Sequence, residues 1–158
     1  MKSDFIEQFN HTWNLMQGLC QDFDEAAWFT IEHGYINPSR LAYHVLLSTL
    51  YYIEDTTEMV FASGRPLAGD WLTMERHLLP SKPDIDQIIP TFRTKTTQWL
   101  AEMDINAPNP TFPWAGQTRL GVVFFLQRHT LYHLGELNAL LQESTNGHAK
   151  DNFIQAFN

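Results

Sequence analysis

The sequence has little of what several classes of protein require. Cys20 is the only cysteine among 158 residues, so the chain forms no internal disulfide and builds no zinc site from cysteines. A reducing, cytoplasmic compartment is therefore the simpler expectation. The longest dense apolar run covers residues 120–126 and is interrupted by Gly121, whereas a membrane span needs roughly 18 apolar residues. The first residues also lack the apolar segment of a signal peptide, and we expect no membrane partner.

Basic residues are scarce as well. Lys and Arg number 10 against 18 Asp and Glu, which gives a formal charge of −8 with the seven histidines neutral. Binding to a nucleic-acid backbone depends on clustered Lys and Arg side chains, and the sequence contains no such cluster. We therefore expect no nucleic-acid partner and no direct binding to an anionic membrane surface.

Apolar side chains are plentiful. Hydrophobic residues make up 44% of the chain and aromatic residues 13%, which argues against a disordered protein. The length is typical of one domain, and a chain of this length can bury about two-thirds of its unfolded surface. We predict a single domain over residues 1–158.

Hydrophobic residues recur at helical spacing in four segments, whereas almost nothing alternates with a period of two. The segments cover residues 4–21, 38–63, 84–104 and 118–144. Helices of these lengths predict an all-α fold, specifically a four-helix bundle. The connection between the second and third segments is too long for a tight hairpin, so we expect it to cross the bundle.

Caps and breakers mark the expected helix ends. The dipeptide Asn37-Pro38 combines a good N-cap with a residue favoured at the first helical position, and Gly64 is a plausible stop for the same helix. Pro90 either kinks the third helix or delays its start. The Asn-Gly pair at 146–147 ends the fourth helix. The tail at 148–158 docks on the bundle or on a partner, and the sequence leaves this open.

The histidines are the strongest indication of chemistry. His129 and His133 are four residues apart in the last predicted helix, so they share one face with Cβ atoms roughly 5–6 Å apart. His44 lies in the first half of the second predicted helix, among apolar residues. Three neutral imidazoles suit a divalent ion such as zinc or nickel. Hydrogen-bonded structural histidines are the alternative. The other four histidines are expected in loops or on the surface: His11, His33, His77 and His148.

Residues 128–141, Arg-His-Thr-Leu-Tyr-His-Leu-Gly-Glu-Leu-Asn-Ala-Leu-Leu, resemble the last-helix signature of the DinB/YfiT-like superfamily, H-x-x-x-H-x-G-[QE]-L. The sequence Leu-Ala-Tyr-His-Val around His44 is similar to the histidine site early in the second helix of that family. This resemblance implies up-down-down-up connectivity, frequent homodimers and a divalent ion held by His44, His129 and His133. Glu136 stands where the family commonly has glutamine, and its spacing from His133 allows a carboxylate near the site.

Three histidines without a fourth ligand predict an open site, because catalytic zinc sites keep one position for water or substrate. Ser48 and Tyr51, four and seven residues after His44, can line the same cavity. The glutamate of the H-E-x-x-H motif is missing between His129 and His133, which disfavours a metallopeptidase. Characterised relatives in the superfamily include thiol-dependent S-transferases and a mycothiol-dependent isomerase.

The resemblance therefore implies a metal-dependent transferase that activates a low-molecular-weight thiol. Glu136 or Tyr132 would orient a ligand or move a proton, although a solvated helix residue and a packing aromatic are the simpler interpretations of these two side chains. Two non-catalytic alternatives remain: a metal-binding module in which occupancy changes dimerisation, and a metal-free, stress-associated bundle. Trp28, Trp71 and Trp114 lie in or near connections, where they wall a pocket or pack structurally.

Overall fold

The computed structural model describes residues 2–30, 33–34 and 36–157, so the outermost positions of the predicted domain, Met1 and Asn158, lie outside it. Within this part of the chain there are six α-helices and no strand, which confirms the all-α prediction. The four long helices are α1 (Lys2–Asp22), α3 (Pro38–Tyr52), α4 (Lys82–Glu102) and α5 (Arg119–Ser144). The shorter elements are α2 (Ala27–Thr30), α6 (Asn152–Gln155) and the 3-10 turns η1 (Arg76–Leu78) and η2 (Pro113–Ala115).

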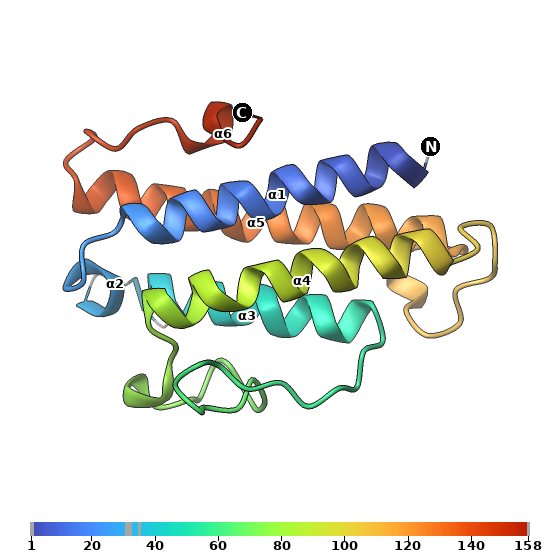
Figure 1. Cartoon of the computed structure of the whole chain (residues 1–158), viewed down its shortest axis with the longest axis horizontal. Helices are drawn as coiled ribbons and strands as arrows, with labels where there is room; N and C mark the ends of the chain where they lie inside the picture. The colour runs from blue at the N-terminus through green and yellow to red at the C-terminus, as the bar shows by residue number, and fades with distance from the viewer. Residues whose placement is uncertain (1, 31–32, 35, 158) are drawn as a thin grey trace.

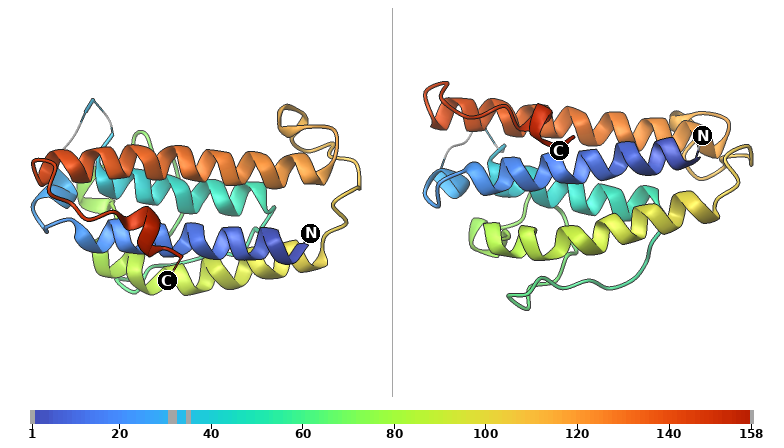
Figure 2. Two further views of the ribbon diagram at one scale, coloured as in Figure 1. Left: turned by 90° about the horizontal axis from the view of Figure 1, so that it is seen from above. Right: turned by 45° about the horizontal axis from the view of Figure 1, so that its top comes forward.

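The long helices lie side by side along one axis (Figures 1 and 2). Helix α1 packs most closely against α4, and α3 against α5. Helices α3 and α4 both run away from the end of the molecule that holds α2, whereas α1 and α5 run toward it (Figure 1). The connection from residue 53 to 81 consequently returns along the outside of the helices (Figure 1).

Aromatic and aliphatic side chains from all four long helices fill the space between them. The apolar stripe of α1 lies in this core: Phe9, Trp13, Met16 and Leu19 are each 2% exposed or less. The indole nitrogen of Trp13 donates to Thr96 Oγ1 at 3.0 Å, so the one polar atom of this side chain is also satisfied inside the core.

The second helix is shorter than predicted. Helix α3 ends at Tyr52, and Glu54 then adopts a left-handed conformation with φ of 57°. The carboxylate of Asp55 accepts hydrogen bonds from the Thr57 amide and from Lys95 Nζ, which turns the chain away from the helix axis. The apolar residues at 59–61 suggested a continuing helix, but they belong to the connection. The predicted stop, Gly64, is a turn within that connection.

Other predicted ends agree with the structure. The side chain of Asn37 accepts a hydrogen bond from the Arg40 amide at 2.9 Å, so it is the N-cap of α3. Helix α4 begins at Lys82 and continues through the exposed Pro90, so this proline does not delay the start of the helix. Helix α5 ends before Asn146 and Gly147, both with positive φ.

The C-terminal tail packs on the chain's own helices. Asn152 of α6 donates to the carboxylate of Asp22 at 2.8 Å, at the end of α1. The carbonyl oxygen of Ala156 lies 2.9 Å from His11 Nδ1 and accepts a hydrogen bond from the side-chain Nδ2 of Asn14 at 3.1 Å. These contacts answer the question of the tail that the sequence left open.

Asp84 joins the start of α4 to the preceding connection. Its replacement by asparagine is expected to lower the free energy of unfolding by about 1–3 kcal/mol at pH 7. Its carboxylate accepts from the amide and hydroxyl of Ser81 and from the Ser63 amide. Burial acts to raise the pKa of this carboxyl, but these hydrogen bonds outweigh it and hold the pKa below the usual 3.8.

A carboxyl with a lowered pKa stabilises the folded state above its unfolded pKa, and this contribution is lost as the pH falls through the folded value. Urea unfolding of wild type and Asp84→Asn at several pH values measures the effect. The difference in the free energy of unfolding between the two proteins should be largest near neutral pH and should shrink below about pH 4. A difference that is independent of pH would assign the effect to packing instead.

Candidate metal centre

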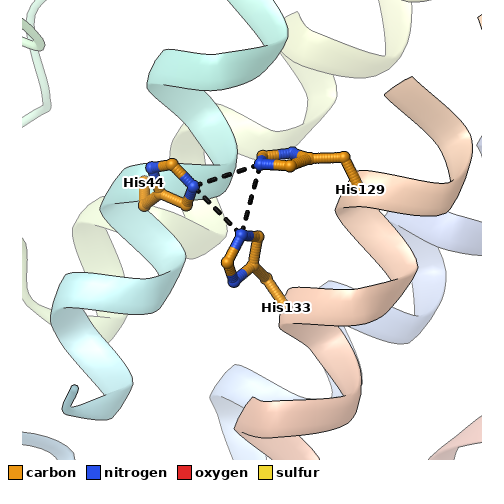
Figure 3. Close-up of side chains that lie close together, drawn as sticks. All are labelled: His44, His129 and His133. Atoms are coloured by element: carbon orange, nitrogen blue, oxygen red, sulfur yellow. Dashed lines mark hydrogen bonds between the residues drawn. The ribbon is translucent and has the colours of Figure 1, made fainter. Parts of the chain in front are cut away.

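The packing of α3 against α5 brings the three predicted histidines together (Figure 3). His44 extends from the first half of α3, while His129 and His133 extend from successive turns of α5. The Nε2 atom of His44 lies 3.3 Å from that of His129 and 3.1 Å from that of His133. The Nε2 atoms of His129 and His133 are 3.2 Å apart. Three ring nitrogens thus form a nearly equilateral triangle.

The size of this triangle suits a single divalent ion. With Zn–N bonds of about 2.0–2.1 Å, two nitrogens of a tetrahedral site lie about 3.3–3.4 Å apart, and adjacent nitrogens of an octahedral site about 2.8–3.0 Å apart. The observed separations of 3.1–3.3 Å lie between these values, nearer the tetrahedral one. The three histidines could therefore hold a metal ion, and the geometry leaves the choice between zinc and nickel open.

Glu136 determines which nitrogen of His133 is available. Its carboxylate Oε2 lies 2.7 Å from His133 Nδ1, on the opposite side of the imidazole from the triangle. A carboxylate only accepts hydrogen bonds, so Nδ1 carries the proton and Nε2 presents its lone pair. The side chain of His133 is 13% exposed. A carboxylate behind a histidine is the usual outer-shell arrangement at protein metal sites.

The other two imidazoles are held mainly by aromatic rings. The ring of His129 stacks on Phe125 with an interplanar angle of 13°, and Tyr52 approaches it edge-on. The Nδ1 atom of His129 is buried and has no hydrogen-bond partner among the described residues. The ring of His44 lies against Trp71 with centroids 4.0 Å apart. Aromatic contacts of this kind restrict the tilt of each ring.

The environment of His44 and His129 favours the neutral form of the imidazole, which is the form that can bind a metal. Burial, followed by the neighbouring imidazoles of His133 and His129, lowers the pKa of His44 to about 3. Burial, followed by His133, lowers the pKa of His129 to about 4. Neutral imidazole is the form that binds metal ions, so both side chains are ready to act as ligands at neutral pH.

Of the remaining predicted site residues, Ser48 and Tyr132 lie beside the triangle, whereas Tyr51, predicted to line the same cavity, points elsewhere. Ser48 Oγ lies within 3.4 Å of both ring nitrogens of His44, as its spacing allowed. The ring of Tyr132 packs edge-on against His133 and is 64% exposed. Tyr51 is turned toward Phe112 and solvent.

The three connecting tryptophans have three different surroundings. Trp71 contacts His44, Trp28 is fully buried and donates to the carbonyl of Pro80, and Trp114 is 57% exposed. Sequence reasoning missed two contacts near the triangle: the stacking of Phe125 on His129, and the hydrogen bonds from the Arg40 guanidinium to the backbone carbonyls of Trp71, Leu72 and Met74. A charged residue one turn before His44, in a helix predicted to be buried on several sides, was the available signal for Arg40.

Comparisons with known proteins add no assignment. Searches of protein-family models, of curated proteins and of solved structures returned no match. Among the described residues, no helix has both the length and the apolar character needed to cross a membrane. The triangle of imidazole nitrogens is therefore the observation from which a function is inferred.

Proposed function

We propose that this protein is an enzyme that binds one divalent ion, zinc or nickel, through His44, His129 and His133 and transfers a small thiol to an electrophile. The triangle of Nε2 atoms, 3.1–3.3 Å on each side, carries this proposal. Three ring nitrogens gather around one point, and Glu136 holds the proton of His133 on the far side of its ring, which is an arrangement suited to binding an ion.

The composition of the ligand set supports catalysis. Within the described part of the chain, the three histidines are the only group of His, Cys, Asp or Glu side chains close enough to hold an ion. Three protein ligands are typical of catalytic zinc sites, which leave a position for water or substrate. All three ligands are neutral, so an ion bound here keeps its full charge and would lower the pKa of a thiol that binds to it.

The thiol must come from outside the chain. Cys20 is the only cysteine, it is 2% exposed, and it lies in the core contributed by α1. Burial raises the pKa of its thiol, so Cys20 is a poor nucleophile. A soluble thiol of low molecular weight is the remaining source of sulfur for the proposed reaction.

In the proposed reaction the thiol sulfur forms a bond to an electrophilic carbon. The bond from that carbon to its leaving group breaks, the leaving group departs with the electron pair, and the thiol proton passes to solvent. Glu136 keeps His133 in the ligating tautomer. Tyr132 is the candidate for guiding the proton, because its ring borders His133 and is open to solvent.

We also propose membership of the DinB/YfiT-like superfamily, with up-down-down-up connectivity. The helix directions in Figure 1 and the site shared by α3 and α5 support both proposals. The homodimer that the resemblance implies stays a prediction. Large exposed apolar side chains on α5 and in the tail are compatible with it, namely Phe124, Leu131, Phe153, Ile154 and Phe157.

Conjugation of thiols to monochlorobimane tests the proposed activity. With glutathione, cysteine or 2-mercaptoethanol, the products are the fluorescent thioether and chloride, and the zinc- or nickel-loaded protein should exceed the spontaneous rate with at least one thiol. Chelation and His129→Ala should both return the rate to the spontaneous value. His77→Ala, which changes an exposed histidine of η1, is the matched control. Equal rates with and without metal for every thiol would contradict the proposal.

A further inference from the structure

The connection between α3 and α4 is fastened to α3 directly beside the metal centre. Arg40 is 9% exposed, and its guanidinium donates to three backbone carbonyls of that connection. One nitrogen contacts the carbonyls of Trp71 and Leu72, and the other donates to the carbonyl of Met74 at 2.9 Å. A buried guanidinium that gives its hydrogen bonds to one short stretch of backbone fixes the position of that stretch.

Two further side chains define this stretch. Tyr43, the residue before His44, donates its hydroxyl proton to the Ala68 carbonyl at 2.6 Å and accepts from the Ala68 amide at 3.0 Å. Asp70 accepts from the Leu72 amide at 2.9 Å and from the Thr73 hydroxyl at 3.0 Å, which shapes a local turn. Residues 68–74 therefore form a preorganised turn that Arg40 and Tyr43 hold against α3.

This turn places an aromatic ring against His44. The indole of Trp71 lies on the imidazole of His44 with ring centroids 4.0 Å apart. His133 has a short hydrogen bond to Glu136, whereas Ser48 Oγ lies at nearly equal distances, 3.3 and 3.4 Å, from the two ring nitrogens of His44. These two long contacts do not fix the imidazole plane, so the principal constraint on it is the indole.

From these contacts we infer that Arg40 and Trp71 are positioning residues for the metal centre. Arg40 fixes the backbone of residues 71–74, this backbone places the indole of Trp71, and the indole holds the imidazole of His44 in the plane that directs Nε2 at the other two ligands. The inference rests on the proposed metal site and adds a third segment of the chain to it. It also makes the crossing connection part of the site rather than only a link between helices.

Metal affinity and ligand field test this inference without any assay of activity. Zn²⁺ affinity is measured by competition with a chromophoric chelator, and the visible absorption of the Co²⁺-loaded protein reports the geometry of the ligands. Trp71→Ala should weaken Zn²⁺ binding by about 10-fold, within the range seen when an outer-shell partner is lost. Trp71→Phe keeps an aromatic face and should stay within about 3-fold of wild type.

Arg40→Lys keeps the charge but cannot reach the carbonyls of Trp71, Leu72 and Met74 together. It should weaken Zn²⁺ binding to a similar extent as Trp71→Ala and shift the Co²⁺ spectrum in the same direction. Binding of Co²⁺ should quench part of the tryptophan emission, and Trp71→Phe should remove most of that quenching. The matched controls are Trp114→Phe and Arg76→Lys, both at exposed positions away from the triangle. Circular dichroism checks that each variant keeps its helices.

The outcomes separate this inference from the proposed function. If His44→Ala loses the ion while Trp71→Ala and Arg40→Lys bind Zn²⁺ and Co²⁺ as wild type does, the positioning role is wrong and the metal site stands. If Trp71→Phe is as weak as Trp71→Ala, an aromatic face is not what holds His44, and the inference also fails. If wild type binds no ion, both the proposed site and the inference are overturned.

Discussion

Alanine in place of His133 is expected to abolish stoichiometric binding of a divalent ion while leaving the helical content of the protein intact. The substitution removes one of three nitrogens that lie within 3.3 Å of one another. The loss of affinity should exceed the roughly 10- to 100-fold that follows removal of an outer-shell partner. Alanine is the best helix former, and His133 is only partly buried on α5, so the helix itself should persist.

Mass spectrometric metal analysis of protein purified without an affinity tag is the measurement. Wild type should carry roughly one ion per chain after reconstitution, and His44→Ala, His129→Ala and His133→Ala should each carry almost none. His77→Ala retains all three ligands and serves as the control. Unchanged metal content in the His133 variant would remove this residue from the ligand set, and metal-free wild type would remove the site altogether.

Glu136→Ala is expected to weaken metal binding by about 10- to 100-fold without touching a ligand. The carboxylate accepts a hydrogen bond from His133 Nδ1 at 2.7 Å, which holds the imidazole in the tautomer whose Nε2 can bind a metal and makes that nitrogen a stronger metal ligand. Glu136→Gln should have a smaller effect, because the amide oxygen still accepts this hydrogen bond but carries no charge.

Competition titrations with a chelator measure the three affinities. Wild type should bind the ion most tightly, Glu136→Gln less tightly, and Glu136→Ala most weakly. Glu143→Ala is the matched control, since this glutamate is also on α5 but lies beside His33 instead. Equal affinities for Glu136→Ala and wild type would show that the carboxylate does not support His133. A glutamine variant weaker than the alanine variant would contradict the hydrogen-bond explanation.

The all-α fold was predictable because its information is local. Spacings of three and four among Phe9, Trp13, Met16 and Leu19 indicate a helix whatever lies beside it, and the cap at Asn37 is a property of a few adjacent residues. The end of α3 was not predictable in the same way. Phe61 is apolar and lies in the core, as a core residue of a helix would, but it belongs to the connection that follows α3. An apolar residue in a sequence does not reveal which kind of element carries it into the core.

The site was predictable only in part for a similar reason. A spacing of four placed His129 and His133 on one face, and His44 was their candidate partner from its place in the second predicted helix, supported by the family resemblance. A spacing of three allowed Glu136 to lie nearby, but the ring nitrogen that it contacts depends on side-chain rotamers. The contact between Trp71 and His44 depends on the course of a long connection, which no periodic pattern in the sequence encodes.

The separation of the three histidines along the chain would give a bound ion a role in folding energetics. His44 is 85 residues from His129 and 89 from His133, so an ion bound by all three would close a long loop and cross-link α3 to α5. Such an ion would bind the native state far better than the unfolded chain. At a free concentration of 100 times its dissociation constant, it would add about 2.7 kcal/mol to stability. The melting temperature of the protein would then report the supply of free metal ions around it.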